Sequence, residues 1–485
     1  MLFNSFEFIF FFLPLVFILY FILLKCGLTT TAKLFLIAGS LFFYAWGNTR
    51  YLLLILASIF INYMVGQLLA KKKTDLSRQL LLGIGIIFNV GLLFYFKYAD
   101  FFIENVNTLF HTQYALLQLA LPLGISFFTF QQIAYLVDTY RRETKETNFF
   151  DYILFVTFFP QLIAGPIVHH KSMIPQFSQR ENQKIHFSNL AAGFFIFSVG
   201  LFKKVGIADH FSTLASQGFG QTASLTFIEA WAVSLSYTFQ LYFDFSGYSD
   251  MAIGLALLFN IRLPKNFDSP YKALNIQDFW RRWHITLSEF LTKYIYIPLG
   301  GNRKGETRTL INIFLVFFIS GFWHGAGWTF IVWGVMHGAA SIIYRLWQKT
   351  GIELNKWIAW LITFNFINTA WVFFRAESIS DAVNVLKGMV GLNGISFSTS
   401  LFPASLTSVM ERFNVPVVQQ YGLMMDRTTF LSLILGFTMV LLLKNSIQLK
   451  ESIKYDMKTA LFAAILFSYA TINLSRVSEF IYFNF

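Results

Sequence analysis

The sequence has little charge and a single cysteine. Lys, Arg, Asp and Glu make up 13% of its 485 residues, about half the share found in soluble globular proteins, which argues against an ordinary soluble enzyme. Cys26 is alone, so an intramolecular disulfide and a Cys-x-x-Cys metal site are excluded. There is no Gly-x-x-x-x-Gly-Lys-Ser/Thr loop and no Gly-x-Ser-x-Gly motif, so neither a Walker-type nucleotide site nor serine-nucleophile chemistry is predicted.

Apolar residues make up 56% of the chain and fall in long runs. A helix needs about 20 mostly apolar residues to span a bilayer, so the runs predict an all-α, polytopic membrane protein with about ten to twelve spans plus re-entrant pieces. No Lys or Arg precedes the first run, so we expect a retained transmembrane helix there and not a cleavable signal peptide. The candidate runs are residues 5–24, 33–46, 51–70, 80–97, 114–138, 150–168, 188–208, 225–243, 246–261, 309–323, 328–346, 356–374, 428–444 and 459–475.

Basic residues predict the orientation of the chain. The cluster in residues 71–78 is expected in the cytoplasm, with the N-terminus outside, and the same rule places residues 262–308 inside and the C-terminus outside. Basic residues in 171–184 also prefer the cytoplasm, which requires residues 150–168 to turn back without crossing. Residues 375–427 are expected to form an extracytoplasmic loop. The net charge of +12 reflects this asymmetry, and no nucleic-acid partner is expected.

One polar island, residues 242–250, lies between two apolar runs and contains two carboxylates. We expect Ser246 and Gly247 to break the helix there, and Asp244 to cap the helix that follows. Intramembrane acids are also candidates for function. A satisfied helix break and direct substrate contact by Asp244, Ser246 and Tyr248 therefore both stay open.

A second island carries an excess of positive charge. Residues 262–308 hold nine Lys or Arg against four Asp or Glu, a net charge of +5. This excess fits either headgroup anchoring or a dock for a phosphorylated donor or an acidic carrier protein. The glycines at 300–301 beside two basic residues are also a weak candidate for a phosphate-binding backbone nest. The candidate contacts are Arg281, Arg282, Arg303 and Lys304.

The polar island that contains histidines is the strongest candidate for a functional site. His324 lies in Gly-Phe-Trp-His-Gly-Ala-Gly-Trp, within an uncharged stretch, and a neutral imidazole can take a proton from a hydroxyl. In one straight helix His337 would lie about 20 Å away on another face, unless Gly325 and Gly327 break the helix. His284, on a separate element, can approach His324 in space. The supporting candidates are His337, Trp323 and Trp283.

These islands, in this order, resemble the membrane-bound O-acyltransferase family, in its bacterial branch of alginate and peptidoglycan O-acetylation proteins. The resemblance covers most of the chain. It rests on the stretches at residues 1–5, 242–249, 281–288 (RRWHITLS), 296–305 (YIPLGGNRKG), 321–328 (GFWHGAGW) and 480–485.

The resemblance implies a single domain over residues 1–485, a ring of tilted helices around a central tunnel. Peripheral helices would lie in 1–150, the catalytic core in 188–350 and C-terminal helices in 428–485. It makes His324 the essential catalytic residue and His284 the second polar residue of the pair. The protein would lie in the bacterial inner membrane among its lipids and need no permanently bound cofactor or metal.

The implied reaction is acetyl transfer from a cytoplasmic thioester, acetyl-CoA or an acylated carrier protein. The acyl group would pass outward to a periplasmic SGNH-hydrolase-like partner that acetylates an envelope polysaccharide. Two alternatives stay open at this point. One is D-alanyl transfer to teichoic acid by a related branch, and the other is a proton-coupled transporter that uses Asp244, Asp250 and the histidines as a relay.

Overall fold

The computed structural model describes residues 1–72, 74–144, 148–219, 224–398, 417–418, 426–474 and 480–481. It is a helical membrane fold, as the composition predicts. Within these residues, seven helical stretches are long and apolar enough to cross a membrane, and three shorter apolar helices accompany them. A two-residue parallel pairing of β1 (Phe397–Ser398) with β2 (Val417–Val418) is the strand content of the described chain. The seven stretches are Glu7–Lys25, Arg50–Lys71, Asp75–Phe110, Phe187–Phe219, Glu306–His324, Trp328–Gln348 and Lys356–Arg375.

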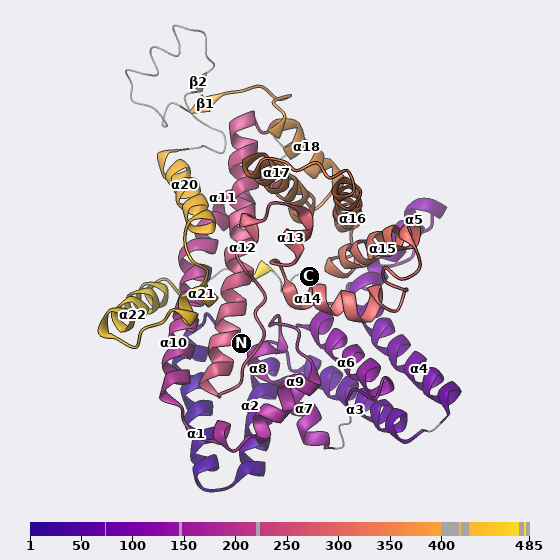
Figure 1. The fold of residues 1–485 in the computed structure, drawn as a ribbon, viewed down its shortest axis with the longest axis vertical. Helices are drawn as coiled ribbons and strands as arrows, with labels where there is room; N and C mark the ends of the chain where they lie inside the picture. The colour runs from indigo at the N-terminus through magenta and orange to yellow at the C-terminus, as the bar shows by residue number, and fades with distance from the viewer. Residues whose placement is uncertain are drawn as a thin grey trace.

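Most of the N-terminal third packs in the lower half of Figure 1, while its α5 lies higher, beside α15. It begins with η1 (Glu7–Phe12), α1 (Leu13–Lys25), α2 (Thr29–Ala45) and α3 (Arg50–Lys71). A nearly continuous rod follows, made of α4 (Asp75–Leu93), the π-helical turn η2 (Phe94–Tyr98) and α5 (Ala99–Phe110). The next helix is α6 (Ile125–Tyr140), so the run predicted at 114–138 is helical only from Ile125 onward.

The middle of the chain contains α7 (Phe149–Thr157), α8 (Phe159–Leu162), α9 (His170–Ser178), η3 (Glu181–Gln183), α10 (Phe187–Phe202), η4 (Lys203–Ala208), α11 (Asp209–Phe219) and α12 (Phe227–Leu258). After α12 come η5 (Pro270–Lys272), α13 (Ile276–Trp280), α14 (Ile285–Leu291), η6 (Thr292–Tyr296), α15 (Glu306–His324), α16 (Trp328–Gln348), α17 (Lys356–Arg375) and α18 (Ile379–Met389). The C-terminal helices are α20 (Arg427–Leu441), α21 (Ser446–Glu451) and α22 (Met457–Ile472). Residues 399–416 and 419–425 of the loop expected at 375–427 lie outside the described residues, as do 482–485 of the terminal motif.

The contacts of Lys33 show that the chain turns back between α6 and α10. Lys33, at the start of α2, pairs with Asp151 of α7 at 2.7 Å, and its Nζ also lies 3.5 Å from the hydroxyl of Ser178 at the end of α9. Both ends of the α7–α9 segment therefore lie at the same end of α2. Because α7 has nine residues and rises only about 13 Å, it is too short to span a bilayer. This geometry agrees with the predicted turn-back of residues 150–168.

α12 is one unbroken helix of 32 residues, so the break expected at Ser246 and Gly247 is wrong. The glycine is there because α10 crosses α12 in close contact. A Cβ on Gly247 would lie 2.8 Å from the carbonyl oxygen of Gly200, and one on Gly254 would lie 2.6 Å from that of Gly193. The 32-residue helix begins at a capping box of Thr226 and Glu229 and runs lengthwise through the upper and middle parts of the molecule in Figure 1.

Adding a single methyl group at this crossing is expected to destabilise the fold. We expect Gly247→Ala to lower the free energy of unfolding by about 1–3 kcal/mol, the usual cost of overpacking, because backbone and not a flexible side chain occupies the space. The matched control is Gly83→Ala in α4, where a Cβ would meet nothing within 4 Å. Thermal unfolding of the purified variants measures the difference. Equal melting temperatures for the two variants would contradict the close crossing.

Both ends of the described chain lie in the interior, near the middle of the molecule in Figure 1. The Met1 amine donates to the Phe43 carbonyl at 3.1 Å. The ring of Tyr248 on α12 stacks on Phe3 and meets the edge of Phe480, each at 4.9 Å between centroids. Phe3 and Phe480 are each only 1% exposed. The aromatic residues near both termini are therefore part of the core around α12.

Candidate active site

His324 is the last residue of α15, and the helix break that would bring it near His337 does occur. Gly325 and Gly327 are extended, with φ of −160° and −168°, and α16 starts at Trp328. The two helices pack side by side, so that the Trp333 ring lies 5.0 Å from His324 and 4.6 Å from His337. An indole therefore lies against both imidazoles, which are 2% and 0% exposed.

His337 is held by a neighbouring tryptophan. The indole Nε1–H of Trp280 donates to Nδ1 of His337 at 3.2 Å. This donor fixes Nδ1 as an acceptor in the neutral ring. Rings from Phe366 and Trp280 pack edge-on against the imidazole at 5.3 and 5.1 Å. These contacts suit a supporting side chain in the wall of the site.

His284 has a fixed tautomer because of a chain of hydrogen bonds. The Ile167 N–H donates to the Thr286 hydroxyl at 3.0 Å, and that hydroxyl and the Thr286 N–H both donate to Oδ1 of Asn266, at 3.0 and 3.2 Å. Backbone N–H groups only donate, so Oδ1 is the amide oxygen and accepts. Nδ1 of His284, 3.2 Å from this oxygen, must therefore carry the proton. Nε2 is left as the accepting nitrogen.

The backbone of His284 holds the same arrangement. This residue adopts the left-handed conformation (φ 44°, ψ 54°) just before α14, which costs about 1 kcal/mol or more for a side chain with a Cβ. The next N–H, that of Ile285, donates to the Asn266 carbonyl at 3.0 Å. Asn266 thus holds both the backbone and the ring of the histidine segment, and its spacing in the sequence gave no signal of this role.

The three histidines form one neighbourhood, as the spacing allows. His324 lies within electrostatic range of His284, His337 and Lys97. The ring of Trp323 lies 6.4 Å from that of His284 and stacks on Phe130 of α6 at 4.9 Å. Trp283 is only 1% exposed and lies in an aromatic cluster with Trp371 of α17. The described structure therefore places both predicted tryptophans in aromatic walls of this neighbourhood.

The 242–250 island divides between two sides of α12. Phe245 faces the site, with its ring edge-on to His284 at 4.7 Å. Asp244 instead pairs with the buried Lys204 at 2.7 Å and accepts from the Ile481 N–H at 3.1 Å. Asp244 therefore lies in mid-helix and caps nothing, contrary to the expectation, because α12 continues through it.

A second buried ion pair lies next to the first. Lys203 pairs with Asp250 at 2.7 Å, and its Nζ is 3.5 Å from the Ser246 hydroxyl. Lys203 and Lys204 form the start of η4, the π-helical turn after α10. Sequence reasoning missed both lysines, although two charges inside the apolar run 188–208 were a usable signal. Within the described chain, Asp244 and Ser246 thus belong to an ion-pair cluster between α10 and α12.

The four basic candidates of segment 262–308 form two pairs. Arg281 and Arg282 directly precede Trp283 and His284, and Arg303 and Lys304 lie in the turn before α15. Arg281, Arg303 and Lys304 are exposed, and Arg282 is half-buried and pairs with Asp278 at 2.9 Å. The glycine turn is not a phosphate nest: the N–H groups of Gly300, Gly301 and Arg303 donate to carbonyls of the turn itself. Side-chain charge is therefore what this surface offers to an anion.

Asp268 connects this basic segment to the C-terminal helices through a hydrogen bond from Asn445. Burial acts to raise the pKa of its carboxyl, but hydrogen bonds from Lys265 and Asn445 hold that pKa below its ordinary range. Its carbonyl also accepts from Arg282 at 3.2 Å. Because the pKa is lowered by folding, the stabilisation is present at neutral pH and is lost as the pH falls through the folded-state value.

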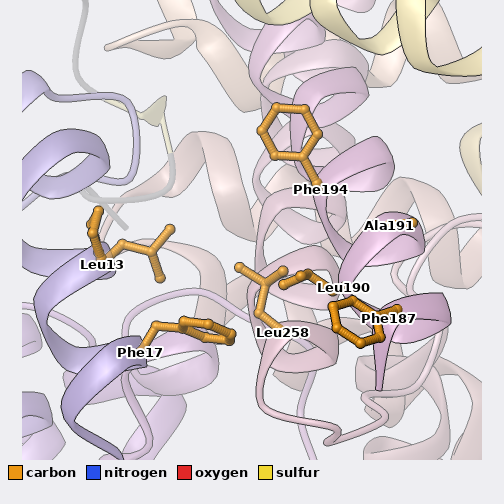
Figure 2. Close-up of a pocket in the computed structure, with 8 residues that line it drawn as sticks. Leu13, Phe17, Phe187, Leu190, Ala191, Phe194 and Leu258 are labelled. Carbon is orange, nitrogen blue, oxygen red and sulfur yellow. The ribbon is translucent and has the colours of Figure 1, made fainter. Parts of the chain in front are cut away.

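Two cavities differ in their chemistry. A polar one of about 320 Å³ lies at the end of α15, and its wall includes Lys97, Asp100, Gly325 and Ala326. An apolar groove of about 640 Å³ lies between α1, α10 and α12; Figure 2 shows its wall of aliphatic and phenyl side chains, among them Phe17, Phe187 and Leu258. The wall of the apolar groove has no group able to transfer a proton, whereas the wall of the polar cavity includes Gly325, the residue after His324. In the described parts of the chain, no three His, Cys, Asp or Glu side chains are placed to hold a metal ion.

Comparison with known proteins assigns the family. A sequence profile of the membrane-bound O-acyltransferase family matches residues 9–379. The peptidoglycan O-acetyltransferase of Helicobacter pylori is 50% identical over 517 residues, with 100% of this chain and 98% of the relative covered. The probable alginate O-acetylase AlgI of Pseudomonas putida is 40% identical over 80% of each chain, and a teichoic acid D-alanyltransferase of Streptococcus thermophilus is 28% identical over 52% of this chain and 68% of its own. The chain belongs to the membrane-bound O-acyltransferase family, whose members transfer acyl groups.

Proposed function

We propose that this protein is an O-acetyltransferase of the bacterial inner membrane. It takes an acetyl group from a cytoplasmic thioester, acetyl-CoA or an acylated carrier protein, and delivers it to the outer side for O-acetylation of an envelope polysaccharide. The relatives that share 40–50% of its residues are named for acetylation of peptidoglycan and alginate. Because the family transfers acyl groups, the proton-coupled transporter is set aside.

The observation that carries this proposal is the place of His324 along α15. The helix has 19 residues between Glu306 and His324 and rises about 27 Å, close to the thickness of the hydrocarbon core. Glu306 pairs with Arg345 and Lys349 at the end that adjoins the basic segment. His324 therefore lies at the opposite end of α15 from Arg303 and Lys304, and next to the polar cavity.

The reaction follows from a neutral, buried imidazole. His324 takes the proton from the acceptor hydroxyl as the hydroxyl oxygen attacks the thioester carbonyl carbon. The carbon–sulfur bond then breaks, the new ester forms, and the imidazolium returns the proton to the leaving thiolate. His284, held by Asn266, orients the hydroxyl or stabilises the oxyanion. Among the groups assigned to the donor side are the exposed Arg281, Arg303 and Lys304, whose charge suits a phosphorylated or acidic donor.

The acceptor side is proposed to involve a separate protein. By family resemblance, an SGNH-hydrolase-like partner in the periplasm receives the acetyl group and esterifies the polysaccharide. Loss of O-acetyl groups from the envelope polysaccharide of a deletion strain, restored by the wild-type gene, is the expected result. Unchanged acetate release after mild base treatment of that polysaccharide would contradict this role.

The donor is tested with purified protein in proteoliposomes. We expect [14C]acetyl-CoA on the cytoplasmic side to be consumed, with one thiol released per acetyl group transferred to the purified partner protein enclosed in the lumen. A D-alanyl carrier protein serves as the competing donor, because one relative of this chain is named a teichoic acid D-alanyltransferase. Turnover of the D-alanyl donor alone would overturn the acetyl assignment and leave acyl transfer intact.

A further inference from the structure

The last four carbonyl groups of a helix have no partner within it, and at the end of α15 these include the carbonyls of Phe322, Trp323 and His324. In many helices a glycine with positive φ folds back to bind them, but here Gly325 continues in an extended conformation, with φ of −160°. Residue 325 must also be a glycine in this conformation, since a Cβ there would clash with the Phe330 ring. The carbonyls of the last residues, His324 included, must therefore be bound from another element.

The element that binds them is η2, the π-helical turn in the rod of α4 and α5. Nζ of Lys97 lies 2.6 Å from the Trp323 oxygen and 3.1 Å from the His324 oxygen. The hydroxyl of Tyr98, the next residue, donates to the Phe322 oxygen at 2.8 Å. Two consecutive side chains of one turn thus cap three consecutive carbonyls. π-helical turns are frequently found at functional sites.

The partial negative charge at the C-terminal end of α15 compensates the positive charge of Lys97. A lysine inside an apolar run is costly unless it is partnered, and none of the ion pairs among the described residues includes Lys97. The C-terminus of a helix carries about half a negative charge and supplies the counter-charge. The third N–H of the ammonium points to the Ser126 hydroxyl at 3.3 Å, so the hydrogen-bonding capacity of the group is used within the protein.

We infer that Lys97 is a positioning residue for acyl transfer, which holds the imidazole of His324 in place through the carbonyls at the end of α15. The inference rests on the proposed function of His324. A residue at the last position of a helix frays most easily, and a displacement of about 1 Å at a reacting group can cost about 100-fold in rate. Lys97 also forms part of the wall of the polar cavity, so its ammonium stands between that cavity and the catalytic helix end.

The test compares three substitutions at Lys97 with one at its neighbour, with acetyl-CoA as the donor. Lys97→Met and Lys97→Gln are expected to lower kcat by about 100-fold and about 10-fold, with the KM for acetyl-CoA changed by less than about 3-fold. Lys97→Arg keeps the charge and the donors and is expected to regain most of the lost kcat. Tyr98→Phe removes a neutral hydrogen bond from the same helix end, leaves Lys97 intact, and is expected to lower kcat by no more than about 3-fold.

The outcomes separate this inference from the proposed function. His324→Gln is measured in the same preparation: if it is inactive while folded Lys97→Met and Lys97→Gln retain wild-type kcat, the positioning role is wrong and the histidine assignment stands. A loss that appears in KM and not in kcat would overturn positioning in favour of donor binding. If Lys97→Met does not fold, Lys97→Gln decides with the same criteria. Wild-type activity in His324→Gln itself would overturn the proposed function.

Discussion

His324→Ala is expected to reduce acetyl transfer from acetyl-CoA by at least about 1,000-fold, near the upper part of the range for loss of a general base. The imidazole is buried at the end of α15, and its neighbours Trp333 and Phe374 are aromatic rings without a basic group. His337 cannot replace it readily, because Nδ1 of that ring already accepts from Trp280. Initial rates of thiol release in proteoliposomes measure the effect.

Two controls separate chemistry from folding. Alanine leaves a cavity beside Trp333, so His324→Gln, which keeps most of the volume, is measured in parallel and is expected to show nearly the same loss of rate. His186→Gln changes an exposed histidine before α10 that contacts the Glu181 carbonyl at 2.7 Å, and it is expected to leave the rate unchanged. A folded His324→Gln variant within about tenfold of wild type would show that the imidazole is not the general base.

The fold class and the histidine cluster are predictable from the sequence for a physical reason. In a chain with 13% charged residues, each polar group inside an apolar run is expensive, so it marks a place where the fold supplies a partner. This argument singled out the segments with His284 and His324, which the structure brings into one neighbourhood, and it required a break at Gly325 and Gly327 before His324 and His337 could meet. The break depends only on local backbone chemistry, which a sequence displays.

The partners of the polar groups could not be predicted in the same way. Asp244 was expected to cap a helix, but its partner Lys204 is 40 positions away on η4, and nothing in the local sequence encodes that distance. Gly247 was misread for a related reason. A glycine can break a helix or permit a close crossing, and only the position of Gly200 on α10 decides between the two.

The same limit applies to Lys97 and Asn266. Lys97 ends one apolar run and binds a helix more than 200 residues later in the chain, while Asn266 lies in an irregular connection without a recognisable motif. Each holds a segment that carries a histidine. A lone lysine in an apolar run is nevertheless a signal that can be used, whereas an asparagine in a polar loop is not.

His284→Ala is expected to lower kcat by about 100- to 1,000-fold, which is less than the loss at His324 because the second imidazole orients or stabilises and does not remove the proton. A substitution at Asn266, which contacts His284 and not the reacting groups, is more informative. Asn266→Leu keeps His284 but deletes the amide oxygen that fixes the proton on Nδ1. The ring can then adopt either tautomer, and we expect a loss of about 100-fold in kcat with little change in the KM for acetyl-CoA.

Thr286→Val is the matched control for this chain of bonds. It removes the hydroxyl that joins Ile167 to Asn266 but leaves the contact of Asn266 with His284, so a loss of no more than about fivefold is expected. The order of kcat should therefore be wild type, Thr286→Val, Asn266→Leu and His284→Ala. If Asn266→Leu is folded and as active as wild type, the tautomer of His284 does not matter, and this histidine acts only by filling space. If Thr286→Val and Asn266→Leu lose equal activity, the network acts through the backbone of α14 and not through Nδ1.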